Sequence, residues 1–218
     1  MIEIPVYTAD GKQSETLSLD EQLLGGEVRP SLLKQAYVMY HANRRQGSAT
    51  TRGRGEVVGS TRKLYKQKGT GRARRGNVRT NVMRGGGVAF GKQARSFRQS
   101  MPTKMRRLAT RNALLAKAID GEIKVVDSFG NGEAPKTSKL AAVLSAIGIN
   151  RTCLLAIGHE DRGTFLAARN LANVNTIQMD QINAYDLLST RFLLVDKATL
   201  SGWLDAQKSA VKTIEEAA

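Results

Sequence analysis

Residues 152–179 read TCLLAIGHEDRGTFLAARNLANVNTIQM, which is an apolar run, a polar turn, a helical pattern and a second apolar run. The runs 152–157 and 174–179 have the length and composition of buried strands. Residues 164–172 between them are rich in alanine and leucine, as expected for a helix. Two parallel strands connected by a helix form a βαβ unit. This stretch therefore predicts an α/β fold.

The same alternation continues on both sides of this stretch. A short apolar strand is expected at 123–126, followed by a helix over 138–147 that ends at Gly148. Beyond residue 179 we expect a short helix at 183–188, a strand at 192–195 and a helix over 197–208, with a frayed tail after residue 210. The fold class predicted is α/β, with a mainly parallel, Rossmann-like sheet flanked by helices.

The N-terminal part adds two strands and two helices to this prediction. Alternating Ile2, Ile4 and Val6 indicate a strand, the Asp10-Gly11 turn follows, and residues 16–19 are its expected return strand. Helices are predicted from Pro30 to about residue 45 and from Pro102 to residue 120. Their expected buried positions are Leu33, Ala36, Tyr37 and Tyr40 in the first helix, and Met105, Leu108, Leu115 and Ile119 in the second.

The segment 44–111 carries nearly all of the excess positive charge. It holds 20 of the 34 Lys and Arg residues but only one acid, Glu56, for a formal charge of +19, while the rest of the chain sums to −4. It also holds 11 of the 21 glycines, and residues 44–100 contain no isoleucine and one leucine. Such a segment cannot bury enough apolar surface to order itself. We predict one α/β domain, 1–218, with residues 46–101 inserted as an extended RNA-binding loop.

The chemistry of this segment suits RNA. Arginine and lysine neutralise phosphates, glycine allows close backbone approach, and Tyr65, Phe90 and Phe97 could stack on unpaired bases. Lys104, Arg107 and Arg111 form a basic stripe on the helix that follows. The predicted RNA-binding residues are Arg44, Arg45, Arg52, Arg54, Arg62, Lys63, Tyr65, Lys66, Lys68, Arg72, Arg74, Arg75, Arg79, Arg84, Lys92, Arg95, Arg98, Lys104, Arg107 and Arg111.

Two glycine patterns resemble nucleotide-binding motifs but lack their context. Gly69-Thr-Gly71 has neither the third glycine nor a preceding strand, and the GxxxxGK match at 86–92 is followed by Gln93 instead of Ser or Thr. An RNA-processing or nucleotide-binding enzyme on a doubly wound sheet is the alternative that these patterns leave open. A DNA-compacting protein is a third hypothesis, although no helix-turn-helix, zinc finger or basic zipper is present.

Catalytic and metal-binding chemistry is poorly represented. His41 and His159 fall in different predicted elements, and His159-Glu160-Asp161-Arg162 has the composition of a polar loop after a strand. The single cysteine, Cys153, lies in an apolar run, where a buried, inert thiol is expected. We predict no catalytic residues, no cofactor and no metal. The N-terminus lacks a secretory signal pattern and no apolar run reaches 18 residues, so a cytoplasmic protein without membrane contact is expected.

Several motifs resemble the bacterial large-ribosomal-subunit protein L4 family. They run along nearly the whole chain: Tyr65-Lys-Gln-Lys-Gly-Thr-Gly-Arg-Ala-Arg74, Arg84-Gly-Gly-Gly-Val-Ala-Phe-Gly91, Ala134-Pro-Lys-Thr137, Phe165-Leu-Ala-Ala-Arg-Asn-Leu171 and Asn183-Ala-Tyr-Asp-Leu-Leu188. The resemblance implies a structural constituent of the large ribosomal subunit that binds ribosomal RNA and acts early in assembly. It also implies an α/β body with a long loop that lines the polypeptide exit tunnel.

By this resemblance, Gln67, Lys68, Gly69, Thr70, Gly71 and Arg72 form the loop tip near the tunnel. The implied partners are large-subunit ribosomal RNA, neighbouring large-subunit ribosomal proteins and the nascent peptide. The chain departs from the family pattern where Pro-Trp is usual, at Leu64-Tyr65, and where Pro-x-Trp is usual, at 81–83. Lys92 also stands where proline is common. These departures imply a more flexible loop with altered stacking.

Overall fold

A computed structural model describes residues 1–129, 136–159 and 161–216, with side chains described through Ser209. Ala134 and Pro135 of one motif, Glu160 and the last two alanines lie outside the described residues. The chain divides into two compact units. The first consists of Met1–His41 together with Gln99–Ala218, and the second is Ala42–Arg98.

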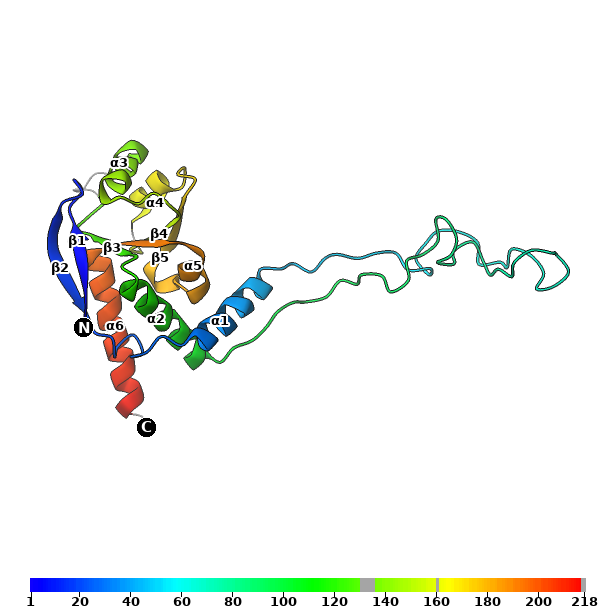
Figure 1. Cartoon of the computed structure of the whole chain (residues 1–218), viewed down its shortest axis with the longest axis horizontal. Helices are drawn as coiled ribbons and strands as arrows, with labels where there is room; N and C mark the ends of the chain where they lie inside the picture. Colours follow the sequence, from blue (N-terminus) through cyan, green and yellow to red (C-terminus); the bar gives the residue numbers. More distant parts are fainter. Residues whose placement is uncertain (130–135, 160, 217–218) are drawn as a thin grey trace. The chain divides into compact units, whose positions relative to one another are not determined.

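The first unit is built around a six-stranded mixed sheet in the described part of the chain (Figure 1). Its strand order is β2-β1-β3-β6-β4-β5, and β1 pairs antiparallel with β2 while the other neighbours are parallel. The strands are β1 (Ile2–Tyr7), β2 (Gln13–Leu19), β3 (Ile123–Val126), β4 (Cys153–Ile157), β5 (Val174–Gln178) and β6 (Phe192–Asp196). The predicted strands are confirmed, and the sheet is mainly parallel.

Helices cover both faces of this sheet. They are α1 (Pro30–Asn43), α2 (Thr103–Ile119), α3 (Thr137–Ile147), α4 (Arg162–Ala168), η1 (Met179–Gln181), α5 (Ala184–Ser189) and α6 (Lys197–Glu216). Buried residues of α1, α2, α5 and α6 form one core, and those of α3 and α4 form another. Figure 1 shows α3 and α4 on the opposite side of the sheet from α2 and α6. The prediction of an α/β body is confirmed.

The central strands alternate between these two cores. Leu193 and Val195 of β6 face the core on the α2 side, whereas Leu194 between them faces the core on the α3 side. All five residues of β4 are buried. This two-sided burial explains why β4 is a continuous apolar run instead of an alternating one.

The helix boundaries and buried faces differ from the prediction in several places: α4 ends at Ala168 instead of residue 172, and α1 ends at Asn43 instead of about residue 45. α4 begins at Arg162, two residues before the expected start, because Asp161 caps it by accepting a hydrogen bond from the Thr164 amide (3.1 Å). α6 continues to Glu216, past the expected fraying point, through a sequence free of glycine and proline after Gly202. Tyr37 and Ile119 were expected to be buried, and both are exposed.

Local packing explains the two exposed side chains. Tyr37 stacks on Tyr185 of α5, with ring centroids 5.0 Å apart, and Met39, which was not predicted to be buried, lies in the core instead. At the end of α2, Leu114 and Ala118 fill the buried positions, so Ile119 faces solvent. A pattern of one apolar residue per turn did not distinguish between these neighbouring positions.

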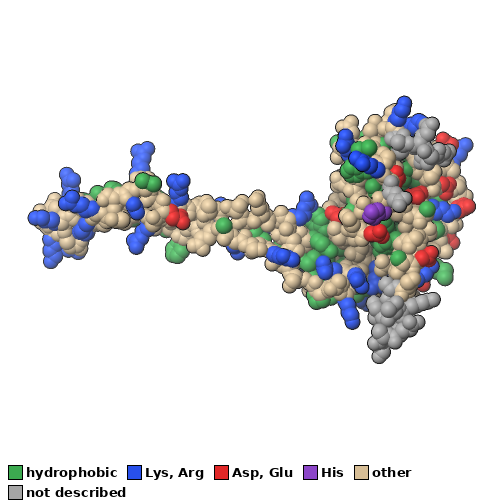
Figure 2. Space-filling view, turned by 180° about the vertical axis from the view of Figure 1, so that it is seen from behind, with side chains coloured by type: hydrophobic (Ala, Val, Ile, Leu, Met, Phe, Trp, Pro, Cys, Tyr) green, Lys and Arg blue, Asp and Glu red, His purple; other side chains and the backbone are tan. Residues whose placement is uncertain are grey.

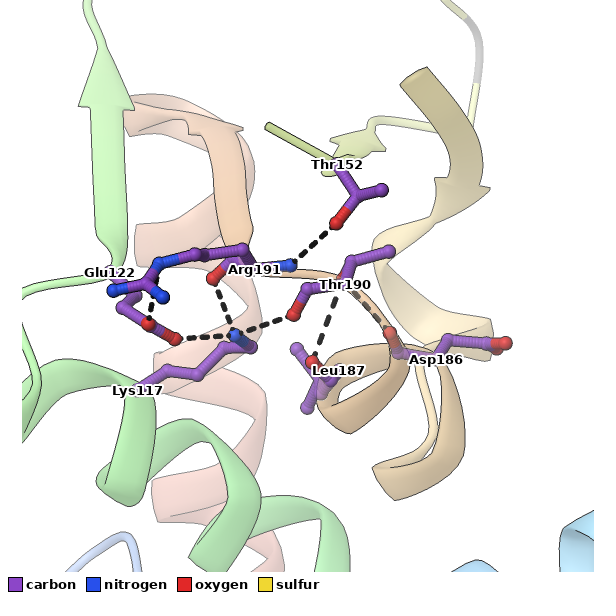
Figure 3. A network of polar contacts seen from close by, with 7 residues as sticks. All are labelled: Lys117, Glu122, Thr152, Asp186, Leu187, Thr190 and Arg191. Atoms are coloured by element: carbon purple, nitrogen blue, oxygen red, sulfur yellow. Dashed lines mark hydrogen bonds and ion pairs between the residues drawn. The ribbon is translucent and has the colours of Figure 1, made fainter. Parts of the chain in front are cut away.

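Two polar side chains of α2 are buried, and the sequence pattern did not predict either. Lys117 is 5% exposed, and its Nζ donates to Glu122 Oε2 (2.9 Å) and to the carbonyl oxygens of Thr190 (2.9 Å) and Arg191 (2.7 Å) (Figure 3). Asn112 donates to the Leu24 carbonyl (3.1 Å) and accepts from the Arg29 amide (3.2 Å). Both residues connect α2 to segments more than 70 positions away, which satisfies their polar atoms and fixes the helix against the sheet.

Within the described residues, no helix is both long enough and apolar enough to cross a membrane. The same residues contain no cluster of His, Cys, Asp and Glu side chains that could hold a metal ion.

Candidate nucleic-acid interface

The second unit contains most of the predicted interface. Residues 42–98 hold 16 Lys and Arg residues and one acid, Glu56, and residues 44–98 contain no helix or strand. Figure 2 shows blue Lys and Arg side chains distributed along this segment. All its predicted RNA-binding side chains are exposed except Tyr65 and Arg79, which are half-buried. Leaving Arg44 aside, no cation of this unit forms an ion pair with a carboxylate of the described residues.

The unit consists of two antiparallel legs that are joined by backbone hydrogen bonds. The legs meet at four places: Arg95 N–H to Gly47 C=O (3.1 Å), Thr51 N–H to Lys92 C=O (2.9 Å), Val88 N–H to Arg52 C=O (3.0 Å) and Leu64 N–H to Gly76 C=O (3.0 Å). The chain reverses direction between Leu64 and Gly76, so the segment 67–72 forms the turn. The bonds are too sparse for a β-ladder, so much of the backbone remains free to bind another molecule.

Glycines make this close approach of the two legs possible. A Cβ on Gly47 would overlap the Arg95 carbonyl, and one on Gly87 would overlap the Arg54 backbone. Gly69 (φ +84°) and Gly71 (φ +63°) adopt the left-handed conformation at the turn, with no atom within 4 Å of where their Cβ atoms would lie. The first pair is required by packing and the second by backbone conformation.

The aromatic residues of this unit have three different environments. The Phe97 ring is contacted by the guanidinium groups of Arg45 (3.7 Å) and Arg95 (4.4 Å), a cation–π arrangement between the two legs. Tyr65 donates from its hydroxyl to the Ala73 carbonyl, so it holds the legs together near the turn. Phe90 is fully exposed and has a positive φ of 49°. Phe90 is therefore the ring most available for stacking on a base.

The Lys63 side chain makes two hydrogen bonds at the turn, one of them to the opposite leg. Its Nζ donates to Gln67 Oε1 (2.8 Å) and to the Arg75 carbonyl (3.1 Å). Lys63 therefore orders the turn as well as carrying charge. By contrast, no contact that would restrain Lys68 is present among the described residues, and its side chain is exposed.

The basic stripe belongs to the first unit and lies on α2. Lys104 and Arg107 are exposed, whereas Arg111 is half-buried and its Nε is inaccessible to solvent and has no hydrogen-bond partner. Burial, and to a lesser degree the charge of Arg107, lowers the pKa of Arg111. Arg107 and Arg111 share a cavity with Asp180 and Trp203, two residues that sequence reasoning missed. No local signal could have identified them, because they lie far away in the sequence.

The residues considered for catalysis are not brought together. His41 stacks on Tyr37, with ring centroids 6.2 Å apart. His159 lies elsewhere, in a cavity at the carboxyl ends of β4 and β5. Cys153 is fully buried, and burial raises its pKa to about 12, so the thiol is protonated and inert. The GxxxxGK match follows no strand, which removes the context that a phosphate-binding loop needs.

Comparison with known proteins identifies the family. The model of the "Ribosomal protein L4/L1 family" matches residues 17–216. A protein of Dehalococcoides mccartyi, "Large ribosomal subunit protein uL4", is 42% identical over 194 residues, which cover 89% of this chain and 92% of the relative. Proteins with the same name from Moorella thermoacetica (41% over 197 residues; 90% and 95% covered) and Rhodopirellula baltica (39% over 201 residues; 92% and 90% covered) are similar. The chain therefore belongs to the ribosomal protein L4/L1 family.

Proposed function

We propose that this chain is a structural constituent of the large ribosomal subunit, that it binds large-subunit ribosomal RNA and that it acts early in subunit assembly. Its membership in a family of ribosomal proteins makes it a ribosomal protein and not an enzyme. The observation that carries the RNA-binding proposal is the concentration of 16 exposed or half-exposed cations against one acid in residues 42–98. Charges of this density repel one another unless a polyanion neutralises them.

Residues 46–101 act, in this proposal, as an extended RNA-binding loop inserted into a single Rossmann-like α/β domain. The sparse hydrogen bonds between its legs support this role, because they leave backbone N–H groups as well as side chains for phosphates and sugars. The stripe of Lys104, Arg107 and Arg111 extends the interface onto α2. The RNA-binding residues are those predicted above, with Lys63 and Tyr65 also ordering the turn.

The turn at Gln67–Arg72 is proposed to reach and line the polypeptide exit tunnel. Two legs of about 27 residues span at most roughly 90 Å at about 3.3 Å per residue, which is ample for crossing from a surface to an interior channel. The exposed turn, with its unrestrained Lys68 and two left-handed glycines, suits a narrow space. The nascent peptide and neighbouring large-subunit ribosomal proteins are the remaining proposed partners, and the ribosome in the cytoplasm is the proposed location.

Crosslinking to RNA in growing cells, followed by mapping of the contacted nucleotides and peptides, tests the central proposal. We expect crosslinks to large-subunit ribosomal RNA from peptides within 44–111. Crosslinks confined to messenger RNA or to DNA would contradict the proposal. Neutralising Arg72, Arg74 and Arg75 together should also lower the log–log salt dependence of RNA binding by about 0.7 per lost phosphate contact on single-stranded RNA.

Two variants separate assembly from the tunnel role. Lys68→Glu should enter large subunits at close to the normal rate but change drug binding or nascent-chain passage in the tunnel, because the turn supplies few phosphate contacts. Replacing Lys104, Arg107 and Arg111 by Gln should slow assembly and leave finished tunnels unchanged. A block of assembly by Lys68→Glu would show that the turn, and not the stripe, governs incorporation.

A further inference from the structure

A small cavity on the first unit combines cationic, acidic and aromatic side chains. Its volume is about 310 Å³, and it lies between α2, η1 and α6. Arg107 and Arg111 line it from α2, Asp180 from η1, and Trp203 and Gln207 from α6. This volume is at the lower end of the range for small-ligand sites, about 300–1,000 Å³, so the cavity can accept one compact group and not a large ligand.

The charged groups of this cavity are not paired with one another. Arg107 and Arg111 lie one helical turn apart, and neither forms an ion pair or a side-chain hydrogen bond with any described residue. The buried Nε of Arg111 has no acceptor at all. Asp180 lines the same cavity but lies beyond ion-pair distance of both guanidinium groups. The cavity therefore presents unused donors on one wall and an unused acceptor on another.

This combination matches the parts of a ribonucleotide. Two guanidinium groups bind a phosphate diester well, because each offers several N–H donors in a planar fork. A carboxylate repels phosphate but accepts hydrogen bonds from a ribose 2′-hydroxyl or a base amino group. Trp203 and Ile182, 8% and 7% exposed, add an apolar wall that suits the flat edge of a sugar or base.

We infer that this cavity holds a single nucleotide of the RNA ligand, with its phosphate on Arg107 and Arg111 and a hydroxyl or amino donor of the same nucleotide on Asp180. The inference rests on the proposed RNA-binding function and adds a defined subsite to it. It also assigns a role to Asp180, since an acid inside a basic interface favours RNA over DNA when it accepts from the 2′-hydroxyl.

Trp203 makes the inference directly testable, because it is the only tryptophan of the chain and it lines the cavity. The full chain is titrated with a short single-stranded RNA while two signals are recorded. Anisotropy of a dye on the RNA reports total binding, including binding by residues 46–101. Trp203 fluorescence reports occupancy of the cavity alone. We expect the wild-type chain to bind the RNA and to show a saturable change in Trp203 fluorescence.

The variants separate the cavity from the rest of the interface. Arg111→Met and Arg111→Lys should abolish the Trp203 response and weaken total binding by on the order of tenfold, because a charge-assisted bidentate contact is lost. Asp180→Ala, which removes the acceptor, should reduce the preference for this RNA over DNA of the same sequence. Arg151→Met, which removes an exposed arginine outside the proposed interface, should change neither signal. Circular dichroism of each variant establishes that it is folded.

The possible outcomes discriminate between the two levels of the proposal. RNA binding without a Trp203 response in the wild-type chain would overturn the cavity inference and leave the proposed function intact. Absence of RNA binding by the wild-type chain would overturn both. Inorganic phosphate that reproduces the full Trp203 response, or an Asp180→Ala variant with an unchanged RNA preference, would reduce the cavity to a simple anion site and overturn the nucleotide assignment.

Discussion

Replacement of Lys117 by methionine should destabilise the α/β body strongly. The Lys117 side chain is 6% exposed, and its Nζ donates to Glu122 and to the carbonyl oxygens of Thr190 and Arg191 (Figure 3). Methionine has a similar length but donates no hydrogen bond, so these acceptors lose their donor. The change therefore removes the link from α2 to the start of β3 and to the connection between α5 and β6.

The expected loss follows from the groups that remain. A buried acceptor left without a donor costs about 1–3 kcal/mol, and removal of one partner of a buried ion pair costs about 3–5 kcal/mol. Glu122 keeps Arg191, whose Nε lies 3.3 Å from Oε1, which favours the lower end of this range. We expect a loss of about 3 kcal/mol in the free energy of unfolding. For a chain of this size that corresponds to a fall in Tm of about 6–12 °C.

Thermal and urea unfolding of the full chain, followed by circular dichroism, measure this loss. Lys139→Met is the matched control, because Lys139 is an exposed lysine of α3, and we expect its effect to stay within about 0.5 kcal/mol. Glu122→Gln keeps an acceptor for Lys117 and should lie between the two. A Lys117→Met chain that unfolds at the same midpoint as Lys139→Met would refute the argument that this network stabilises the fold.

Three further predictions concern other parts of the molecule. Burial raises the pKa of Cys153 to about 12, so the thiol of the folded chain should resist labelling near pH 8. The free energy of unfolding should fall as pH rises from about 9 to about 12, because the thiol of the unfolded chain ionises first. Labelling of the folded chain at the rate of the unfolded chain would contradict this prediction. Gly87→Ala should open the pairing of the two legs, since the new Cβ would overlap the Arg54 backbone. Gly53→Ala is the control, because a Cβ at Gly53 has no atom within 4 Å. Equal hydrogen exchange at the Val88 amide in both variants would argue against tight packing at Gly87. Joining Gln46 to Met101 through a short glycine linker should leave a body that unfolds in one cooperative transition, because neither core contains a residue from 42–98; a molten product would show that the removed segment supports the core.

The strands of the sheet could be predicted because they are local features. Apolar runs such as 153–157 and the alternating Ile2, Ile4 and Val6 mark buried strands wherever they pair. Two helix ends set by nearby residues, at Gly148 after α3 and Asn183 before α5, were also visible, whereas the Asp161 cap of α4 was not. The segregation of charge into one segment is a property of the sequence alone, and it was enough to locate the candidate interface.

The tertiary structure decided what depends on distant partners. The sequence gives no sign that β6, the last strand, lies between β3 and β4, because strand order depends on how helices pack over the sheet. Lys117 belongs to a charged residue type that is usually exposed, and besides the nearby Glu122 its burial depends on the carbonyl groups of residues 190 and 191, more than 70 positions away. Arg111 likewise belongs to a predicted stripe, but its cavity with Asp180 and Trp203 exists only where α2, η1 and α6 meet. Burial and convergence of side chains are properties of long-range packing, and neither composition nor periodicity records them.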